Sequence, residues 1–263
     1  MKKHFKEYEE LCFTDDYMFC MILTTRLDLC KELLELILDI KIRKVEIAEQ
    51  QKNVDITYDG KGVRFDVYVD DAENTVYDIE MQTTRQKERT RYYQGMIDLN
   101  LIQKGMRYSE LKKSYVIFIC LEDVFGKNLP VYTFNYICEQ DYSVRLGDEA
   151  TKVIVNVAGS RNGLSEDMCS FLDFLSKKET NSNFTKELQG AVNESIAKKK
   201  WKVEYMTIME KIREEREDAA IKTTIITLKR LNFPDNVIID NIIKNCSLTE
   251  EEAKEALLNY EKE

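Results

Sequence analysis

The strongest constraint on the fold lies in residues 65–82, FDVYVDDAENTVYDIEMQ, where apolar and polar residues alternate on both sides of a short acidic segment. Because successive side chains of a β-strand point to opposite faces, this alternation predicts an antiparallel hairpin with strands over 63–70 and 75–82. The acidic residues 71–74 supply the turn. The polar positions of the two strands include Asp66, Asp78, Glu80 and Gln82.

Two further segments extend the hairpin into a layered fold. Residues 85–105 are typical of a helix closed by Gly105, and the apolar run SYVIFIC that follows suits a strand buried on both faces. A strand, a helix and a buried strand in succession imply a crossover, and therefore an α/β layer fold. Periodicity also predicts helices within 5–40 with a break near Thr24–Asp28, strands at VYTFNYIC and TKVIVNV, and helices from Glu166 onward.

The C-terminal third is predicted to be helical throughout. A stretch from about Thr185 to Leu231, with only Gly190 as an interior breaker, exceeds the usual helix length of a compact domain. Two short helices follow it, but the acidity of residues 235–263 opposes a helix-turn-helix DNA reader. We therefore expect a domain over 1–180 and a helical extension over 181–263, which packs or self-associates.

Composition removes several classes of chemistry. The single histidine, His4, lies near the N-terminus, so a Ser-His-Asp triad or a two-histidine zinc site has no imidazole to use. The seven cysteines show no C-x-x-C pair, which favours buried reduced thiols. A net charge of −9 opposes DNA binding through overall positive charge. No apolar run of about 18 residues occurs, so no membrane segment and a cytoplasmic location are expected.

The hairpin predicts a metal site. If the polar faces of its strands are in register, Asp66 and Glu80 converge, and two close carboxylates repel each other unless a cation lies between them. Mg²⁺ suits such oxygen ligands, with Mn²⁺ as an alternative, and it can activate water for phosphodiester hydrolysis. The Met81 carbonyl is a candidate third ligand. The competing interpretation is that these acids are simply solvated on an exposed strand face.

Basic residues follow the hairpin directly. A stripe of them beside a metal centre would hold the phosphates of a DNA strand, whereas alone it would be a solvated helix face with Glu88 as partner. The residues are Arg85, Lys87, Arg89 and Arg91.

The strings KGVRFDVYVDD, YDIEMQ, RYYQGMIDLNLIQKGMRYSELKKSYVIFIC and YTFNYICEQD together resemble the PD-(D/E)XK nuclease family transposases, or Rpn family of recombination-promoting nucleases. The resemblance runs from about Asp15 to Gly159. It implies a restriction-endonuclease-like core, a mixed central sheet flanked by helices, followed here by the helical extension.

The same resemblance assigns roles by position. It implies metal binding by Asp66 and Glu80, with Gln82 in the place of the motif lysine. A first-helix string DYMFC places Asp16 near the site, with Cys20 where the family has a basic residue. The string RYYQG matches Arg91 and Gln94 to helix positions that orient phosphate or water. A neutral amide at Gln82 positions only by hydrogen bonds, so Arg91 is the candidate for the missing positive charge.

These observations predict a Mg²⁺-dependent DNA endonuclease, a metal-dependent deoxyribonuclease linked to recombination or mobile elements. A first alternative is a non-catalytic protein that keeps the nuclease fold as a DNA-binding or self-association scaffold. A second is a coiled-coil adaptor built on the C-terminal helices, through which a homo-oligomer would form.

Overall fold

The chain divides into two compact units. The computed structural model describes residues 6–54, 63–82, 87–102, 104–246 and 248–260; the side chains of residues 47, 48, 50–54, 63, 64 and 82 are not described. One unit comprises residues 9–198, and the other comprises residues 1–8 together with 199–263. This division differs from the predicted one at 180/181, because helix α5 (Asn183–Ala197) packs with α1, α2 and α4 in the first unit.

The first unit is built on one mixed sheet of six strands in the order β1-β2-β3-β4-β6-β5. The strands β1 to β3 pair antiparallel, β3, β4 and β6 pair parallel, and β5 pairs antiparallel with β6. Their bounds are β1 Val45–Val54, β2 Val63–Asp71, β3 Val76–Gln82, β4 Ser114–Cys120, β5 Val131–Phe134 and β6 Ala150–Asn156. The predicted hairpin is therefore β2–β3, and β4 lies inside the sheet as expected.

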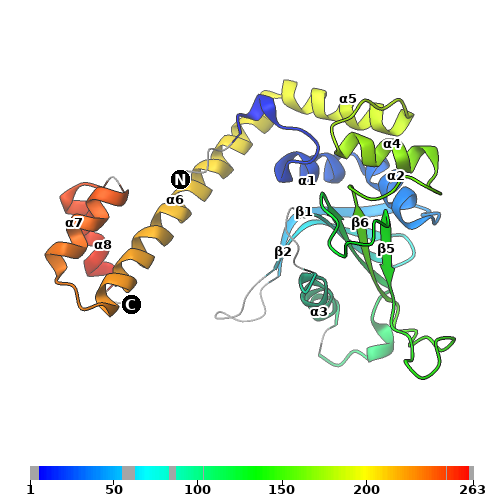
Figure 1. Ribbon diagram of the computed structural model, residues 1–263, viewed down its shortest axis with the longest axis horizontal. Coiled ribbons are helices and arrows are strands. Elements are labelled where there is room, and N and C mark those ends of the chain that lie inside the picture. The colour runs from blue at the N-terminus through cyan, green and yellow to red at the C-terminus, as the bar shows by residue number, and fades with distance from the viewer. Residues whose placement is uncertain (1–5, 55–62, 83–86, 103, 247, 261–263) are drawn as a thin grey trace. The chain divides into compact units, whose positions relative to one another are not determined.

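Helices cover both faces of this sheet (Figure 1). On one face α1 (Asp16–Thr25) and α2 (Leu27–Leu38) pack against the hairpin side, and α4 (Glu166–Leu175) and α5 lie outside them. On the other face α3 (Arg89–Leu101) makes the crossover from β3 to β4. Short 3₁₀ turns lie at Tyr8–Glu10, where the division between the two units falls, and at Tyr108–Glu110 in the first unit. A mixed sheet flanked by helices confirms the predicted α/β class.

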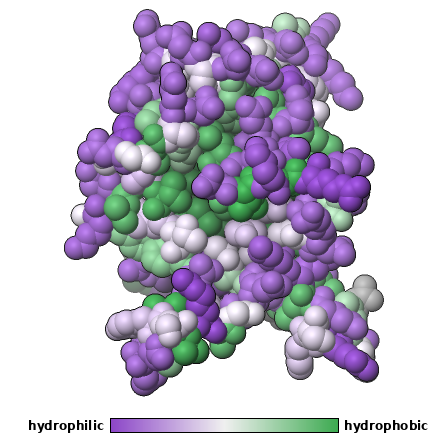
Figure 2. Space-filling view, turned by 90° about the vertical axis from the view of Figure 1, so that its right-hand side faces the viewer, coloured by the Kyte–Doolittle hydropathy of each residue, from purple (hydrophilic) through white to green (hydrophobic). Residues whose placement is uncertain are grey.

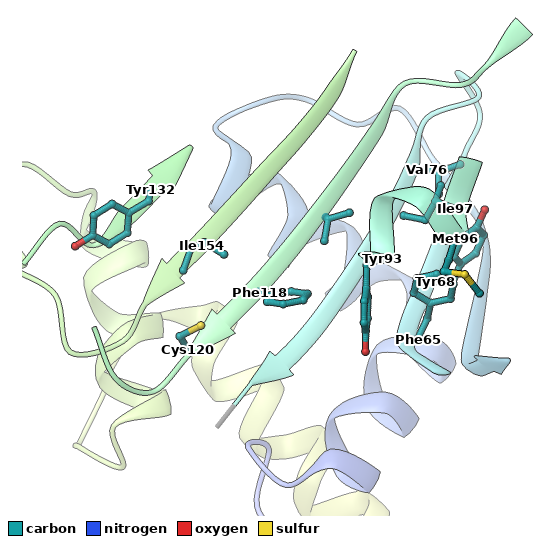
Figure 3. Close-up of a cluster of buried hydrophobic side chains, with 11 residues drawn as sticks. Phe65, Tyr68, Val76, Tyr93, Met96, Ile97, Phe118, Cys120, Tyr132 and Ile154 are labelled. Carbon is teal, nitrogen blue, oxygen red and sulfur yellow. The ribbon is translucent and has the colours of Figure 1, made fainter. Parts of the chain in front are cut away.

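The core beneath α3 is aromatic. The ring of Tyr93 lies between those of Phe65 and Phe118, at centroid distances of 5.3 and 5.5 Å, and meets both nearly edge-on (Figure 3). Edge-to-face contacts of this kind add to the stability gained by burial. They also fix the first turns of α3 against the end of the hairpin, where the polar residues of β2 and β3 lie.

Around β5 the surface is partly apolar. The large side chains exposed there are Leu129, Phe134, Tyr136 and Ile137. Figure 2 shows hydrophobic side chains gathered across the middle of one face of the molecule, between hydrophilic ones above and below. None of the helices in the described part of the chain is long and apolar enough to cross a membrane.

The second unit is a long helix with a helix pair packed on it. It contains α6 (Lys199–Arg230), α7 (Asp235–Cys246) and α8 (Glu250–Tyr260), which bury Ile225, Ile238, Ile242, Ala253 and Leu257 together. The prediction of one helical stretch from Thr185 to Leu231 is wrong, because the helix breaks at Lys198, whose ψ is 106°. Gly190 lies inside α5 without breaking it.

Residues near the start of the chain belong to this second unit. The ring of Tyr8 packs on that of Tyr205 of α6 at a centroid distance of 5.7 Å. The Tyr205 hydroxyl donates a hydrogen bond of 2.8 Å to the carbonyl oxygen of Lys6. These contacts hold residues 6–8 against α6.

Candidate metal and nuclease site

The pairing of β2 with β3 ends just before two acidic residues, Asp66 and Glu80. It runs from Asp70 and Val76 to Val67 and Ile79 and ends there, one residue short of Asp66 on β2 and of Glu80 on β3. Beyond this point Asp66 lies beside Asp16 and Cys20 of α1, whereas Glu80 lies beside Arg89 of α3.

At this point each carboxylate bonds to the backbone of the other strand. The Asp66 N–H donates to Glu80 Oε1 at 2.7 Å, and the Met81 N–H donates to Asp66 Oδ2 at 3.1 Å. The side chains thus replace the hydrogen bonds that a continuing ladder would make. The carboxylate pair, Asp66 and Glu80, is held at the open end of the hairpin.

Helix α1 brings a third carboxylate and a thiol to Asp66. Asp16 and Cys20 lie one helical turn apart, and the Cys20 Sγ is 3.8 Å from Asp16 Oδ1. One ligand atom from each of Asp16, Cys20 and Asp66 lies within 4.8 Å of the others. We call these three residues the Cys20 cluster. Asp16 is exposed and Cys20 is fully buried, so the cluster reaches from the core to the surface.

Glu80 also has a cationic partner. Arg89, the first residue of α3, donates from Nη2 to Glu80 Oε2 at 3.1 Å and also donates to the Tyr93 hydroxyl. Its guanidinium carbon lies 4.9 Å from the centre of the Tyr93 ring and 5.5 Å from that of Phe118. Glu80 is only 2% exposed, so the carboxylate end of this ion pair is buried. The guanidinium end is held in place by its contacts with the two aromatic rings.

Asp78 is a further acid close to the pair. It precedes Glu80 by two residues on β3 and is fully buried. Neither of its carboxyl oxygens has a hydrogen-bond partner among the described residues. Burial, with repulsion from Glu80, raises the pKa of Asp78 well above its ordinary value.

The electrostatics of the pair fit a divalent ion. Burial and the charges of Glu80 and Asp16 raise the pKa of Asp66 from 3.8 to about 8. Burial raises the pKa of Glu80 from 4.5 to about 7, although the Asp66 amide and Arg89 oppose that shift. Carboxyls that hold protons at neutral pH because they are buried release them when a divalent cation binds. Asp66 and Glu80 are thus oxygen ligands suited to Mg²⁺ or Mn²⁺.

The predicted basic stripe takes a different form. Helix α3 begins at Arg89, and Lys87 lies in a turn before it, so Lys87 does not share a helical face with Arg89 and Arg91. Lys87 and Arg91 are exposed, whereas Arg89 bonds to Glu80. Arg85 lies outside the described residues. Arg89 thus places its positive charge against Glu80, and a charge supplied by Arg91 stays a prediction.

Gln94 is the predicted residue that the structure does not bring to the pair. Its amide donates to Ser114 Oγ at 2.8 Å and to Asp98 Oδ1 at 3.0 Å. Ser114 is the first residue of β4, whereas Glu80 pairs with Phe118 further along that strand. The contacts of Gln94 therefore tie α3 to the opposite end of the sheet.

The two remaining predicted residues end strand β3. Met81 is half-buried and bonds to Asp66 through its amide, and Gln82 pairs with Cys120 of β4. The side chain of Gln82 lies outside the described part of the structure.

Two contacts at the site escaped sequence reasoning. Cys20 was identified only as a departure from a family pattern, and its spacing from Asp16 in DYMFC was the available signal. The Glu80–Arg89 pair joins residues nine apart across a strand, a turn and a helix start, and no local periodicity indicates it.

Comparison with known proteins adds one match. A model of the PD-(D/E)XK nuclease family transposases matches residues 14–159, more than half of the chain and all of the sheet. No curated protein and no solved structure matches the chain.

Proposed function

The chain belongs to the PD-(D/E)XK nuclease family transposases, and from this premise we propose that it is a divalent-metal-dependent endonuclease that hydrolyses DNA phosphodiester bonds. The observation that carries the proposal is the meeting of Asp66 and Glu80 at the open end of the hairpin, with each carboxylate bonded to the other strand. A role in recombination or mobile-element DNA, in the cytoplasm, is part of the proposal.

Asp66 and Glu80 would hold the ion, with Met81 offering its carbonyl oxygen. Mg²⁺ is the proposed ion and Mn²⁺ the alternative. When bound, such an ion lowers the pKa of water and neutralises phosphate charge.

The protein's own cations divide the remaining work. Arg89 stabilises the carboxylate of Glu80 and keeps a positive charge beside the reacting phosphate, in a chain where Gln82 replaces the motif lysine. The exposed Lys87 and Arg91 bind DNA phosphates along the start of α3. Asp16 completes the acidic surroundings of Asp66.

Cleavage of plasmid DNA with Mg²⁺ tests the proposal. Asp66→Asn and Glu80→Gln remove one ligand charge each with little change of shape, and we expect the cleavage rate to fall about a thousandfold or more. The matched control is Asp70→Asn on the same strand, whose carboxylate pairs with Lys112 away from the site. Equal cleavage by the wild type and Asp66→Asn, with both folded by circular dichroism, would contradict the proposal.

A second candidate is supported by the Arg89–Glu80 ion pair. Both Glu80 oxygens already accept hydrogen bonds, from the Asp66 amide and from Arg89, so the hairpin end is satisfied without a metal. A non-catalytic scaffold that binds DNA through exposed Lys87 and Arg91 would need no more. In that case DNA binding would be indifferent to Mg²⁺ and to Asp66→Asn, and no cleavage product would accumulate.

A further inference from the structure

The Cys20 cluster combines donor atoms that no Mg²⁺ site requires. Asp16 and Asp66 offer carboxylate oxygens and Cys20 offers sulfur, all within 4.8 Å of one another. Mg²⁺ selects hard oxygen ligands, whereas a thiolate among carboxylates favours Zn²⁺, and Co²⁺ as its spectroscopic substitute. The donor set therefore has a preference different from that of Asp66 and Glu80 alone.

The cluster is also held in place by the fold. Asp16 and Cys20 are one turn apart on α1, and α1 packs on β2, which carries Asp66. The Cys20 side chain is fully buried, so its sulfur has little freedom to move away. Asp16 is exposed and gives an ion access from solvent. Three ligands from two packed elements make a preorganised chelate with room for further ligands.

By contrast, the other buried thiols lack such neighbours. Cys30 on α2 and Cys120 on β4 are as buried as Cys20, yet neither joins a group of metal-ligating residues in the described part of the chain. Burial alone raises the pKa of Cys30 to about 12, which keeps it a thiol. Burial therefore does not distinguish Cys20; its two carboxylate neighbours do.

We propose that Asp16, Cys20 and Asp66 form a Zn²⁺ site in which the Cys20 sulfur is a direct ligand. On binding, the sulfur–hydrogen bond breaks, the proton passes to solvent and the thiolate binds the ion. Because Asp66 belongs to both the cluster and the carboxylate pair, Zn²⁺ competes with Mg²⁺ for it. This competition, which rests on the proposed nuclease function, makes Zn²⁺ an inhibitor of cleavage.

Titration of the reduced full-length protein with Co²⁺ tests the site without any nuclease assay. A thiolate ligand gives Co²⁺ a sulfur-to-metal charge-transfer band in the near ultraviolet, and we expect this band in the wild type. It should be lost in Cys20→Ser and kept in Cys120→Ser, which removes a buried thiol outside the cluster. Zn²⁺ should abolish the band at one equivalent. Absence of the band, or its survival in Cys20→Ser, would overturn the proposal.

A second variant covers the case in which Cys20→Ser does not fold. Asp16 is exposed, so Asp16→Asn changes the cluster without disturbing the core, and we expect Co²⁺ affinity to fall about tenfold or more. An unchanged affinity would count against the site.

Cleavage assays separate this inference from the proposed function. With Mg²⁺ fixed, Zn²⁺ should inhibit the wild type at concentrations about tenfold or more below those needed for Cys20→Ser. If Mg²⁺ supports cleavage and no charge-transfer band forms, the Zn²⁺ site is wrong and the nuclease stands. If the band forms and no cleavage occurs, the Zn²⁺ site stands and the proposed nuclease function is wrong.

Discussion

Arg89 sets a permanent positive charge against Glu80 in a hairpin whose motif position for a cation is filled by the neutral Gln82. The guanidinium is held by Glu80, by the Tyr93 hydroxyl and by two aromatic rings, so its position is fixed by several contacts. A charge that is fixed before substrate arrives costs no reorganisation during reaction. Under the proposed nuclease function, Arg89 supplies the positive charge that the neutral Gln82 does not.

Substitution of Arg89 should separate charge from geometry. We expect Arg89→Gln to lower the cleavage rate about tenfold to a hundredfold and to raise the Mg²⁺ concentration required, because Glu80 loses its partner. Arg89→Lys keeps the positive charge but loses the planar guanidinium, with its several donors and its stacking on the aromatic rings. Its cleavage rate should therefore lie between those of the wild type and Arg89→Gln. Steady-state rates over a Mg²⁺ series measure both effects, with Arg145→Gln on the exposed β5–β6 loop as control. Identical Mg²⁺ curves for the wild type and Arg89→Gln would refute this role.

At the scale of elements, the periodicity of the sequence predicted those strands whose side chains alternate between apolar and polar or form a continuous apolar run. The alternation in β2 and β3 and the apolar run of β4 predicted strands, and hydrogen bonds from side chain to backbone hold Asp66 and Glu80 where the pairing of β2 and β3 ends. The polar strand β1, EIAEQQKN, carries no such signal, because it is an edge strand formed by pairing with β2. The break at Lys198 has neither glycine nor proline to mark it. The Cys20 cluster depends on how α1 packs on β2, which periodicity does not encode.

Two glycines illustrate how differently elements tolerate change. A Cβ at Gly159 would lie 2.7 Å from the carbonyl oxygen of Leu129, on the backbone that leads into β5, so Gly159→Ala should lower the free energy of unfolding by about 1–3 kcal/mol. A Cβ at Gly190, inside α5, would have no atom within 4 Å. Because alanine favours the helix more than glycine does, Gly190→Ala should raise the free energy of unfolding by about 0.5–1 kcal/mol. Urea unfolding measures both. Shifts of the same sign would contradict this account.

For the whole molecule, the division into two units places the proposed metal site and the single tryptophan in different parts of the chain. The single tryptophan, Trp201, is the third residue of α6 and lies in the second unit, whereas the carboxylate pair lies in the first. Self-association through α6 to α8 stays a prediction, which light scattering of the full chain tests. Tryptophan fluorescence will therefore report on the second unit alone, whereas far-ultraviolet circular dichroism will report on the helices and strands of both units.

The stability of the first unit should depend on pH and metal together. In the folded state the pKa of Asp66 is raised from 3.8 to about 8, and that of Glu80 from 4.5 to about 7. Between the ordinary and the raised pKa values, the folded state therefore binds more protons than the unfolded state. Without a divalent ion, stability is greatest below pH about 4 for these groups and falls as pH rises through those values. Added Mg²⁺ should then raise the melting temperature more at pH 8 than at pH 5.

Thermal unfolding by circular dichroism measures this effect, and the Trp201 fluorescence transition should move less with Mg²⁺. The double variant Asp66→Asn, Glu80→Gln removes both titrations, so its melting temperature should lose most of the metal dependence. A metal-induced shift that is equal at both pH values and persists in the double variant would contradict the assignment.

The packing of Tyr8 on Tyr205 also bears on how the chain is made. During synthesis the N-terminal residues emerge first, yet the Tyr205 hydroxyl that bonds to Lys6 lies 199 residues away in the sequence. The first unit, residues 9–198, is complete before Tyr205 leaves the ribosome, so it can fold before residues 6–8 meet their partner on α6. A product that stops after Lys198 would carry the carboxylate pair intact and leave the aromatic ring of Tyr8 uncovered.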